Sequence, residues 1–131
     1  MNVTRLIALT LGLLLLTGAT LFAARTANLD VDASWRLLQE RGDLFLLDVR
    51  TPGEYRQFRL KDARLIPIDQ LERRLAEIPR DQPILVYCAV GSRSSQVVNF
   101  LARRGYPEVY NMAGGIYSWA NRGYPVLQGS P

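Results

Sequence analysis

The distribution of charge divides the chain into an apolar first segment and a longer part in which apolar and polar runs alternate. Residues 6–24 carry no charge and follow Arg5. As a helix they would be about 28 Å long, close to the ~30 Å hydrocarbon thickness of a bilayer. This pattern is typical of a secretory signal peptide, here with a cut after Ala23, or of an uncleaved membrane anchor. We predict that residues 1–24 serve one of these purposes and that residues 25–131 form one domain, in the periplasm or on the outer face of the inner membrane.

Beyond the first segment, apolar runs of strand length alternate with stretches of helical periodicity. The strands are predicted at residues 29–31, 44–49, 64–66, 83–88 and 108–112. The helices are predicted from Asp32 or Ser34 to Glu40, from Thr51, and over 69–77, 94–104 and 116–120. Strands without polar alternation are typical of a parallel sheet covered on both faces. The order of elements therefore predicts an α/β fold of three layers, with a central parallel sheet of about five strands and helices on both faces.

Two features of the composition exclude whole classes of site. The chain has no histidine, and Cys88 is its only cysteine. A Ser-His-Asp triad, a Cys-His pair, a His-bearing zinc or haem site, a CxxC pair and an internal disulfide are therefore impossible within this chain. We expect no metal and no cofactor. The net charge is only +4, and the arginine pairs at 73–74 and 103–104 lie in helical patterns, so we expect no nucleic-acid partner.

The loop after the most apolar strand is the candidate active site, because ligands of parallel sheets bind at the carboxyl ends of strands. It begins at Cys88 and continues with Ala89, Val90, Gly91, Ser92, Arg93 and Ser94. Such a loop can turn its N–H groups inward, and the positive end of the following helix and Arg93 add to the same field. These features favour a thiolate at Cys88 without an imidazole. The alternative is that Cys88 is only a small buried hydrophobe, and the loop by itself does not decide between sulfur, phosphate and arsenate as its anion.

Four segments carry a resemblance to a known family. Residues 48–55 match the pattern D-V-R-x-x-x-E-[YF], and residues 88–94 match C-x-x-G-x-R-S. Residues 104–110 match a helix-to-strand turn, and residues 113–125 match G-G-x-x-x-W…G-x-P. Together they span nearly all of residues 29–126, and in this combination the chain resembles the single-domain rhodaneses, a family of sulfurtransferases.

The resemblance implies a rhodanese-like fold and a persulfide intermediate on Cys88. Thiosulfate or a similar small anion would donate the sulfur, and cyanide or a thiol would accept it. The loop from Ala89 to Ser94 would bind the donor, with its N–H groups stabilising the charged sulfur and Arg93 attracting the anion. Asp48 and Arg50 would brace this loop by hydrogen bonds; the alternative for them is an ion pair local to the strand end.

One short segment departs from the family pattern. Phe58-Arg59-Leu60 stands where the family usually has Gly-His-Ile, so the turn between Glu54 and Ile66 is the part of the fold that the resemblance predicts least well.

Loop length separates the competing activities. Cys88 and Arg93 are spaced as C-x4-R, whereas the related phosphatases and arsenate reductases use C-x5-R, a wider loop for a tetrahedral oxyanion. The shorter loop favours sulfur transfer. A third hypothesis is a carrier that receives sulfur from a partner and has little turnover of its own.

Overall fold

The computed structural model describes residues 23–131. The predicted signal peptide or anchor therefore lies outside the described residues, apart from its last two positions. From residue 23 onward, no helix is both long enough and apolar enough to cross a membrane.

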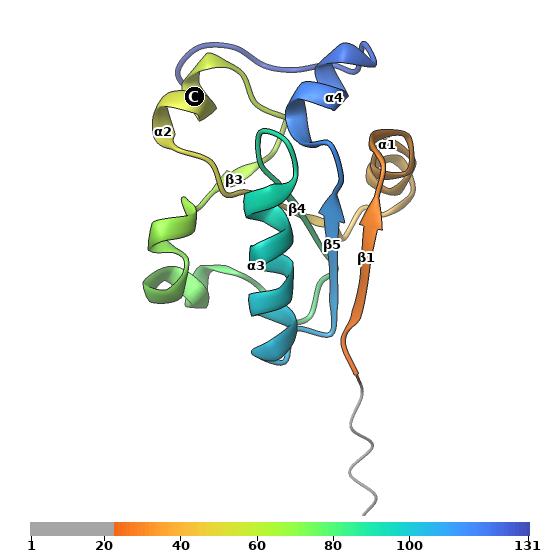
Figure 1. Ribbon diagram of the computed structural model, residues 1–131, viewed down its shortest axis with the longest axis vertical. Helices are drawn as coiled ribbons and strands as arrows, with labels where there is room; N and C mark the ends of the chain where they lie inside the picture. The colour runs from red at the N-terminus through yellow and green to blue at the C-terminus, as the bar shows by residue number, and fades with distance from the viewer. Residues whose placement is uncertain (1–22) are drawn as a thin grey trace, which may run out of the picture.

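A five-stranded parallel sheet forms the centre of the molecule (Figure 1). Its strands, in chain order, are β1 (Arg25–Leu29), β2 (Phe45–Asp48), β3 (Arg64–Leu65), β4 (Ile84–Tyr87) and β5 (Glu108–Met112). Their order across the sheet is β1-β5-β4-β2-β3, and every pairing is parallel. The predicted fold class is confirmed. β4 lies at the centre of the sheet, so the loop after it opens at the middle of the carboxyl edge.

Helical segments cover both faces of the sheet (Figure 1). They are α1 (Val31–Glu40), α2 (Pro52–Gln57), the 3₁₀ segments η1 (Ile68–Gln70) and η2 (Glu72–Glu77), α3 (Ser92–Arg103) and α4 (Gly115–Asn121). α3 and the 3₁₀ segments pack on one face, and α1, α2 and α4 pack on the other.

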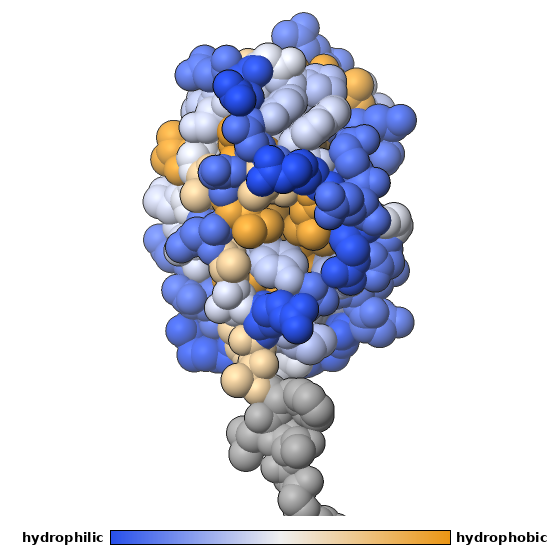
Figure 2. All heavy atoms as spheres, turned by 90° about the vertical axis from the view of Figure 1, so that its right-hand side faces the viewer, coloured by the Kyte–Doolittle hydropathy of each residue, from blue (hydrophilic) through white to orange (hydrophobic). Residues whose placement is uncertain are grey.

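The alternation of side chains along the central strands produces two hydrophobic cores. In β4, Ile84 and Val86 belong to the core beneath α3, whereas Leu85 and Tyr87 belong to the core beneath α1 and α4. All four side chains are fully buried, which explains why this strand reads as one continuous apolar run. Hydrophilic residues cover most of the face on the β1 and α1 side, around a small hydrophobic area (Figure 2).

The first strand and helix begin earlier than predicted. The prediction of a strand at residues 29–31 was wrong, since Arg25–Leu29 forms β1 and pairs with β5 at the edge of the sheet. Its exposed, mostly polar side chains give no apolar signal, and only hydrogen bonding to β5 makes it a strand. The helix is capped by Asp30, whose carboxylate accepts from the N–H of Ala33 at 2.7 Å, rather than by Asp32 or Ser34.

Two helix predictions also needed correction. Residues 69–77 do not form a continuous α-helix but two 3₁₀ segments separated at Leu71, and Arg74 has non-helical dihedrals inside η2. Leu71 and Ile78 are nevertheless buried in the core, as their spacing predicted. α3 begins at Ser92, two residues before the predicted start, because Gly91 turns the chain directly from the loop into the helix.

The segment that departs from the family pattern joins α2 to the end of the chain. Phe58 has an extended backbone that ends α2. Arg59 exchanges two backbone hydrogen bonds with Leu127, at 2.9 and 2.8 Å, and its guanidinium donates to the carbonyl oxygen of Gly129. In this chain Arg59 therefore holds the carboxyl-terminal residues 127–129 against the turn that follows α2.

Candidate active site

The loop after β4 turns at a glycine that few other residues could replace. Gly91 has a φ of 100°, and a Cβ on it would lie 3.1 Å from the backbone nitrogen of Gly114 and 3.4 Å from the carbonyl oxygen of Met112. A side chain here would meet rigid backbone as well as adopting an unfavourable dihedral. The loop thus reaches α3 in a tight turn that closes around the end of the strand.

Three hydrogen bonds converge on the sulfur of Cys88. The N–H of Gly91 lies 3.1 Å from Sγ, the N–H of Ser94 3.4 Å and the hydroxyl of Ser94 3.3 Å. Burial by itself raises the pKa of this thiol. The hydroxyl and N–H of Ser94, with the N–H groups of Gly91 and Val90, outweigh burial, so the pKa of Cys88 lies below its ordinary value. The arrangement favours a thiolate without any imidazole.

The amino terminus of α4 holds the outer side of the same loop. The N–H of Ile116 donates to the carbonyl of Cys88 at 2.9 Å, and the N–H of Tyr117 donates to the carbonyl of Ala89 at 3.2 Å. Within a trans peptide the C=O and N–H point in opposite directions. Fixing the carbonyl of Ala89 toward α4 therefore turns the N–H of Val90 away from α4, toward the sulfur.

This contact between loop and helix requires a glycine in α4. A Cβ on Gly115 would lie 2.4 Å from the carbonyl oxygen of Ala89 and 2.6 Å from the nitrogen of Val90. Real Cβ atoms do not approach backbone so closely, so only glycine lets α4 pack against the loop.

A buried asparagine holds the loop from the side of the sheet. Asn111 in β5 donates from Nδ2 to the carbonyl of Gly91 at 3.3 Å and to Oδ1 of Asn28 at 3.0 Å. The peptide whose carbonyl it binds adjoins the Gly91 N–H that reaches the sulfur. Asn111 is a residue that sequence reasoning missed, because only the pairing of β5 with its neighbours brings it to the loop.

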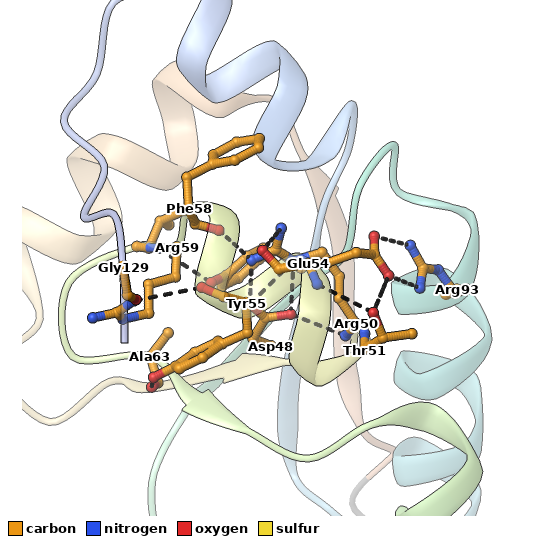
Figure 3. A network of polar contacts seen from close by, with 12 residues as sticks. Asp48, Arg50, Thr51, Glu54, Tyr55, Phe58, Arg59, Ala63, Arg93 and Gly129 are labelled. Carbon is orange, nitrogen blue, oxygen red and sulfur yellow. Dashed lines mark hydrogen bonds and ion pairs between the residues drawn. The ribbon is translucent and has the colours of Figure 1, made fainter. Parts of the chain in front are cut away.

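Arg93 is engaged by a carboxylate from another element (Figure 3). Its Nη1 and Nη2 donate to the two carboxylate oxygens of Glu54 at 2.8 and 2.9 Å, a bidentate ion pair between α3 and α2. Glu54 also accepts from the N–H and the hydroxyl of Thr51, both at 3.1 Å. Hydrogen bonding to Arg93 is the main reason that the pKa of Glu54 falls to about 2. Glu54 is the second residue missed, although the capping-box spacing Thr51-x-x-Glu54 pointed to its location.

Asp48 and Arg50 form a buried ion pair at the end of β2. Nη2 of Arg50 lies 2.7 Å from Oδ2 of Asp48, and its Nε donates to the same carboxylate. Arg50 also donates to the carbonyl of Phe58 at 2.7 Å and to that of Glu54 at 3.4 Å. These bonds hold α2 rather than residues 88–94, so the pair supports the loop through the helix that carries Glu54 (Figure 3).

The predicted loop residues take different places in the structure. Gly91 and Ser94 are buried against the sulfur, and Val90 turns its N–H inward while its side chain is 60% exposed. The carbonyl of Ala89 is held by α4, and the side chain of Ser92 points to solvent. Across residues 23–131, no three cysteine, aspartate or glutamate side chains come close enough to hold a metal ion.

Comparison with known proteins gives one consistent family. The family model described as "Rhodanese-like domain" matches residues 31–122. A protein of Allochromatium vinosum named "Sulfurtransferase" is 36% identical over 100 residues, which cover 76% of this chain and 94% of that protein. "Thiosulfate sulfurtransferase GlpE" of Coxiella burnetii is 30% identical over 86 residues, covering 66% and 79% respectively. The crystal structure of a rhodanese-related protein from Thermoplasma volcanium superposes with a TM-score of 0.69 at 32% identity, covering 76% of this chain and 96% of that one.

Proposed function

The chain belongs to the rhodanese-like domain family, and from this premise we propose that it is a sulfurtransferase that carries sulfane sulfur as a persulfide on Cys88. The observation that carries the proposal is the set of N–H and O–H donors around Sγ. Such donors stabilise negative charge on the attacking sulfur and on the outer sulfur of the persulfide alike.

In the first step the thiolate of Cys88 attacks the outer sulfur of a donor such as thiosulfate. A bond forms between Sγ and that sulfur, and the S–S bond of thiosulfate breaks. The electron pair of that bond leaves with sulfite, and the enzyme keeps an anionic persulfide. No proton has to move, which suits a site without a general base.

In the second step a thiolate or cyanide attacks the outer sulfur of the persulfide. The bond between the two sulfurs of the persulfide breaks, and its electron pair returns to Sγ as the thiolate. The products are an organic persulfide or thiocyanate and the free enzyme. Because each step releases a product before the next substrate enters, the kinetics are expected to be ping-pong.

Intact-mass measurement tests the covalent intermediate. Incubation with thiosulfate, followed by removal of the excess, is expected to add about 32 Da, the mass of one sulfur, to the wild-type protein and nothing to Cys88→Ser. Addition of cyanide should then remove the added mass and produce one equivalent of thiocyanate. A Cys88→Ser protein that still transfers sulfur would refute the assignment of the nucleophile.

Steady-state turnover separates an enzyme from a sulfur carrier. Both would load one sulfur, but only the enzyme would release many equivalents of thiocyanate for each protein with thiosulfate and cyanide in excess. Hydrolysis of a phosphoester or reduction of arsenate without any added sulfur would favour the phosphatase or arsenate-reductase alternatives.

We also propose that the domain acts outside the cytoplasm. The support is the uncharged run at residues 6–24 behind Arg5. The test is fractionation of cells that express the full chain, with the amino-terminal mass of the recovered protein. Recovery of the unprocessed protein from the cytosol would refute this part of the proposal.

A further inference from the structure

The positively charged side chain of the loop already forms an ion pair with a carboxylate of the protein. Arg93 is the only cationic residue among residues 88–94, and both of its terminal nitrogens donate to Glu54. Glu54 is itself held by Thr51. A bidentate pair fixed on both sides leaves the guanidinium poorly placed to bind a second anionic group. Thiosulfate is a dianion, and a free guanidinium would favour the binding of its sulfonate end.

Apolar and aromatic side chains lie on the loop and on the elements beside it. The side chain of Val90 is 60% exposed, and Tyr117, whose N–H binds the carbonyl of Ala89, is 49% exposed. The ring of Phe58 lies 5.7 Å from the ring of Tyr117, and Figure 3 shows it directed toward α4. Phe58 stands where the family pattern has glycine, so this aromatic contact is a departure of this chain.

We propose that the site selects sulfane donors that carry an apolar organic group and a single negative charge, and that Glu54 is the positioning residue that sets this preference by neutralising Arg93. Phe58, Tyr117 and Val90 would contact the organic group. The inference rests on the proposed function, because it names the substrate class of the same reaction.

An organic thiosulfonate is a suitable probe of this class. The thiolate of Cys88 attacks its outer sulfur, the S–S bond breaks and the electron pair leaves with the organic sulfinate. The enzyme again keeps an anionic persulfide, so atoms and charge balance as they do with thiosulfate. Thiosulfate, methanethiosulfonate and benzenethiosulfonate differ in charge, in the size of the organic group and in the leaving group, which is sulfite or a sulfinate. Comparison of variants with the same donor removes the contribution of the leaving group.

The first arm of the experiment measures kcat and KM for each of these donors with cyanide as acceptor. For the wild type we expect the highest kcat/KM with benzenethiosulfonate. Glu54→Gln keeps an oxygen that can cap Thr51 but removes the charge, so Arg93 becomes available to the donor. The KM for thiosulfate should fall roughly three- to tenfold, with a smaller change for the two monoanions and an unchanged kcat. The gain should disappear in the double variant Glu54→Gln/Arg93→Gln.

A matched control removes an ion pair that involves no residue of the loop or of α2. Glu77 in η2 pairs with Arg74 of the same segment and with Arg64 of β3, and Glu77→Gln should leave all three KM values unchanged. If the KM for thiosulfate fell in both Glu→Gln variants, the change in the net charge of the protein would explain the effect. That result would overturn the assignment to Glu54.

The second arm tests the apolar group independently of Glu54. Phe58→Ala should lower kcat/KM for benzenethiosulfonate several-fold and leave that for methanethiosulfonate unchanged. The proposal is overturned if Glu54→Gln shifts all donors equally, or if Phe58→Ala does not distinguish the phenyl from the methyl donor. These outcomes differ from failure of the proposed function, in which no donor adds sulfur to Cys88 of the wild type.

Discussion

The hydroxyl of Ser94 offers a direct test of how the thiolate is stabilised. Ser94 is fully buried, and its Oγ lies 3.3 Å from Sγ of Cys88. Ser94→Ala removes this donor but keeps the backbone N–H of the same residue and that of Gly91, so the loop retains its main supports. The variant isolates one hydrogen bond to the reacting atom.

The size of the expected effect follows from the geometry. A hydrogen bond to a charged group contributes about 1.5–3 kcal/mol, and 1.36 kcal/mol corresponds to one pKa unit. The bond is long and other donors remain, so we expect the pKa of Cys88 to rise by about one unit, toward the lower end of that range. At a pH well below the pKa of the wild-type thiol, the thiolate fraction and with it the rate of sulfur loading should fall roughly tenfold.

The pKa of Cys88 is measured from the pH dependence of the far-ultraviolet absorbance of the thiolate. The pH dependence of the rate of alkylation by a small haloacetamide gives a second measure. Ser95→Ala is the matched control, since this half-buried serine follows in the same helix and has no side-chain bond to the sulfur. If the pKa of Cys88 is the same in Ser94→Ala as in the wild type, or rises as much in Ser95→Ala, then Ser94 does not set the ionisation of Cys88.

The same shift links stability to pH, with a definite sign. A thiol whose pKa is lower in the folded than in the unfolded protein stabilises the fold fully above the unfolded value, about 8.5. That stability is lost as the pH falls through the folded pKa of Cys88, which lies below the ordinary value. Ser94→Ala should therefore cost the most stability in alkaline solution and less in acid, as measured by urea unfolding across this range.

Three further predictions concern the supports of the loop. Gly115→Ala places a Cβ 2.4 Å from backbone at a φ of +63°. We expect the free energy of unfolding in urea to fall by about 2–5 kcal/mol, with less sulfur loading. A variant as stable as the wild type would contradict the close approach of α4 to the loop. Asp48→Asn leaves the buried guanidinium of Arg50 without its counter-charge and should cost about 3–5 kcal/mol in the same assay, whereas a cost below about 1 kcal/mol would show that the pair is dispensable. The pKa of Glu54, about 2 against an ordinary 4.5, means that its pair with Arg93 stabilises the fold above pH 4.5 and loses this contribution as the pH falls toward 2. Since the pair is partly exposed, we expect only about 1 kcal/mol, absent in Glu54→Gln; equal acid sensitivity of the two proteins would argue against it.

The polar network beneath α2 shows where prediction from sequence stops. Asp48 and Arg50 were recognised from one motif, yet the alternatives of loop brace and local ion pair could not be separated along the chain. The structure shows an ion pair that also binds α2, which in turn presents Glu54 to Arg93. Glu54 and Arg93 are 39 residues apart in sequence, so no local pattern contains their contact.

The boundaries that were predicted wrongly share one cause. β1 is a strand because its backbone pairs with β5, and its polar side chains carry no hydrophobic period. Residues 69–77 have the apolar spacing of a helix, but the chain buries Leu71 and Ile78 through 3₁₀ turns. In both places contacts distant in sequence outweighed the local preference.

The residue types and the spacing of hydrophobic and polar positions were enough to establish the fold class, the place of the Cys88 loop at the end of a buried strand and the lack of an imidazole. Folding was needed to establish how that loop is held: by α4 through Gly115, by β5 through Asn111 and by α2 through Glu54. Those contacts join segments that only the assembled sheet brings together, because hydrogen bonds act over about 3 Å in space without regard to separation along the chain.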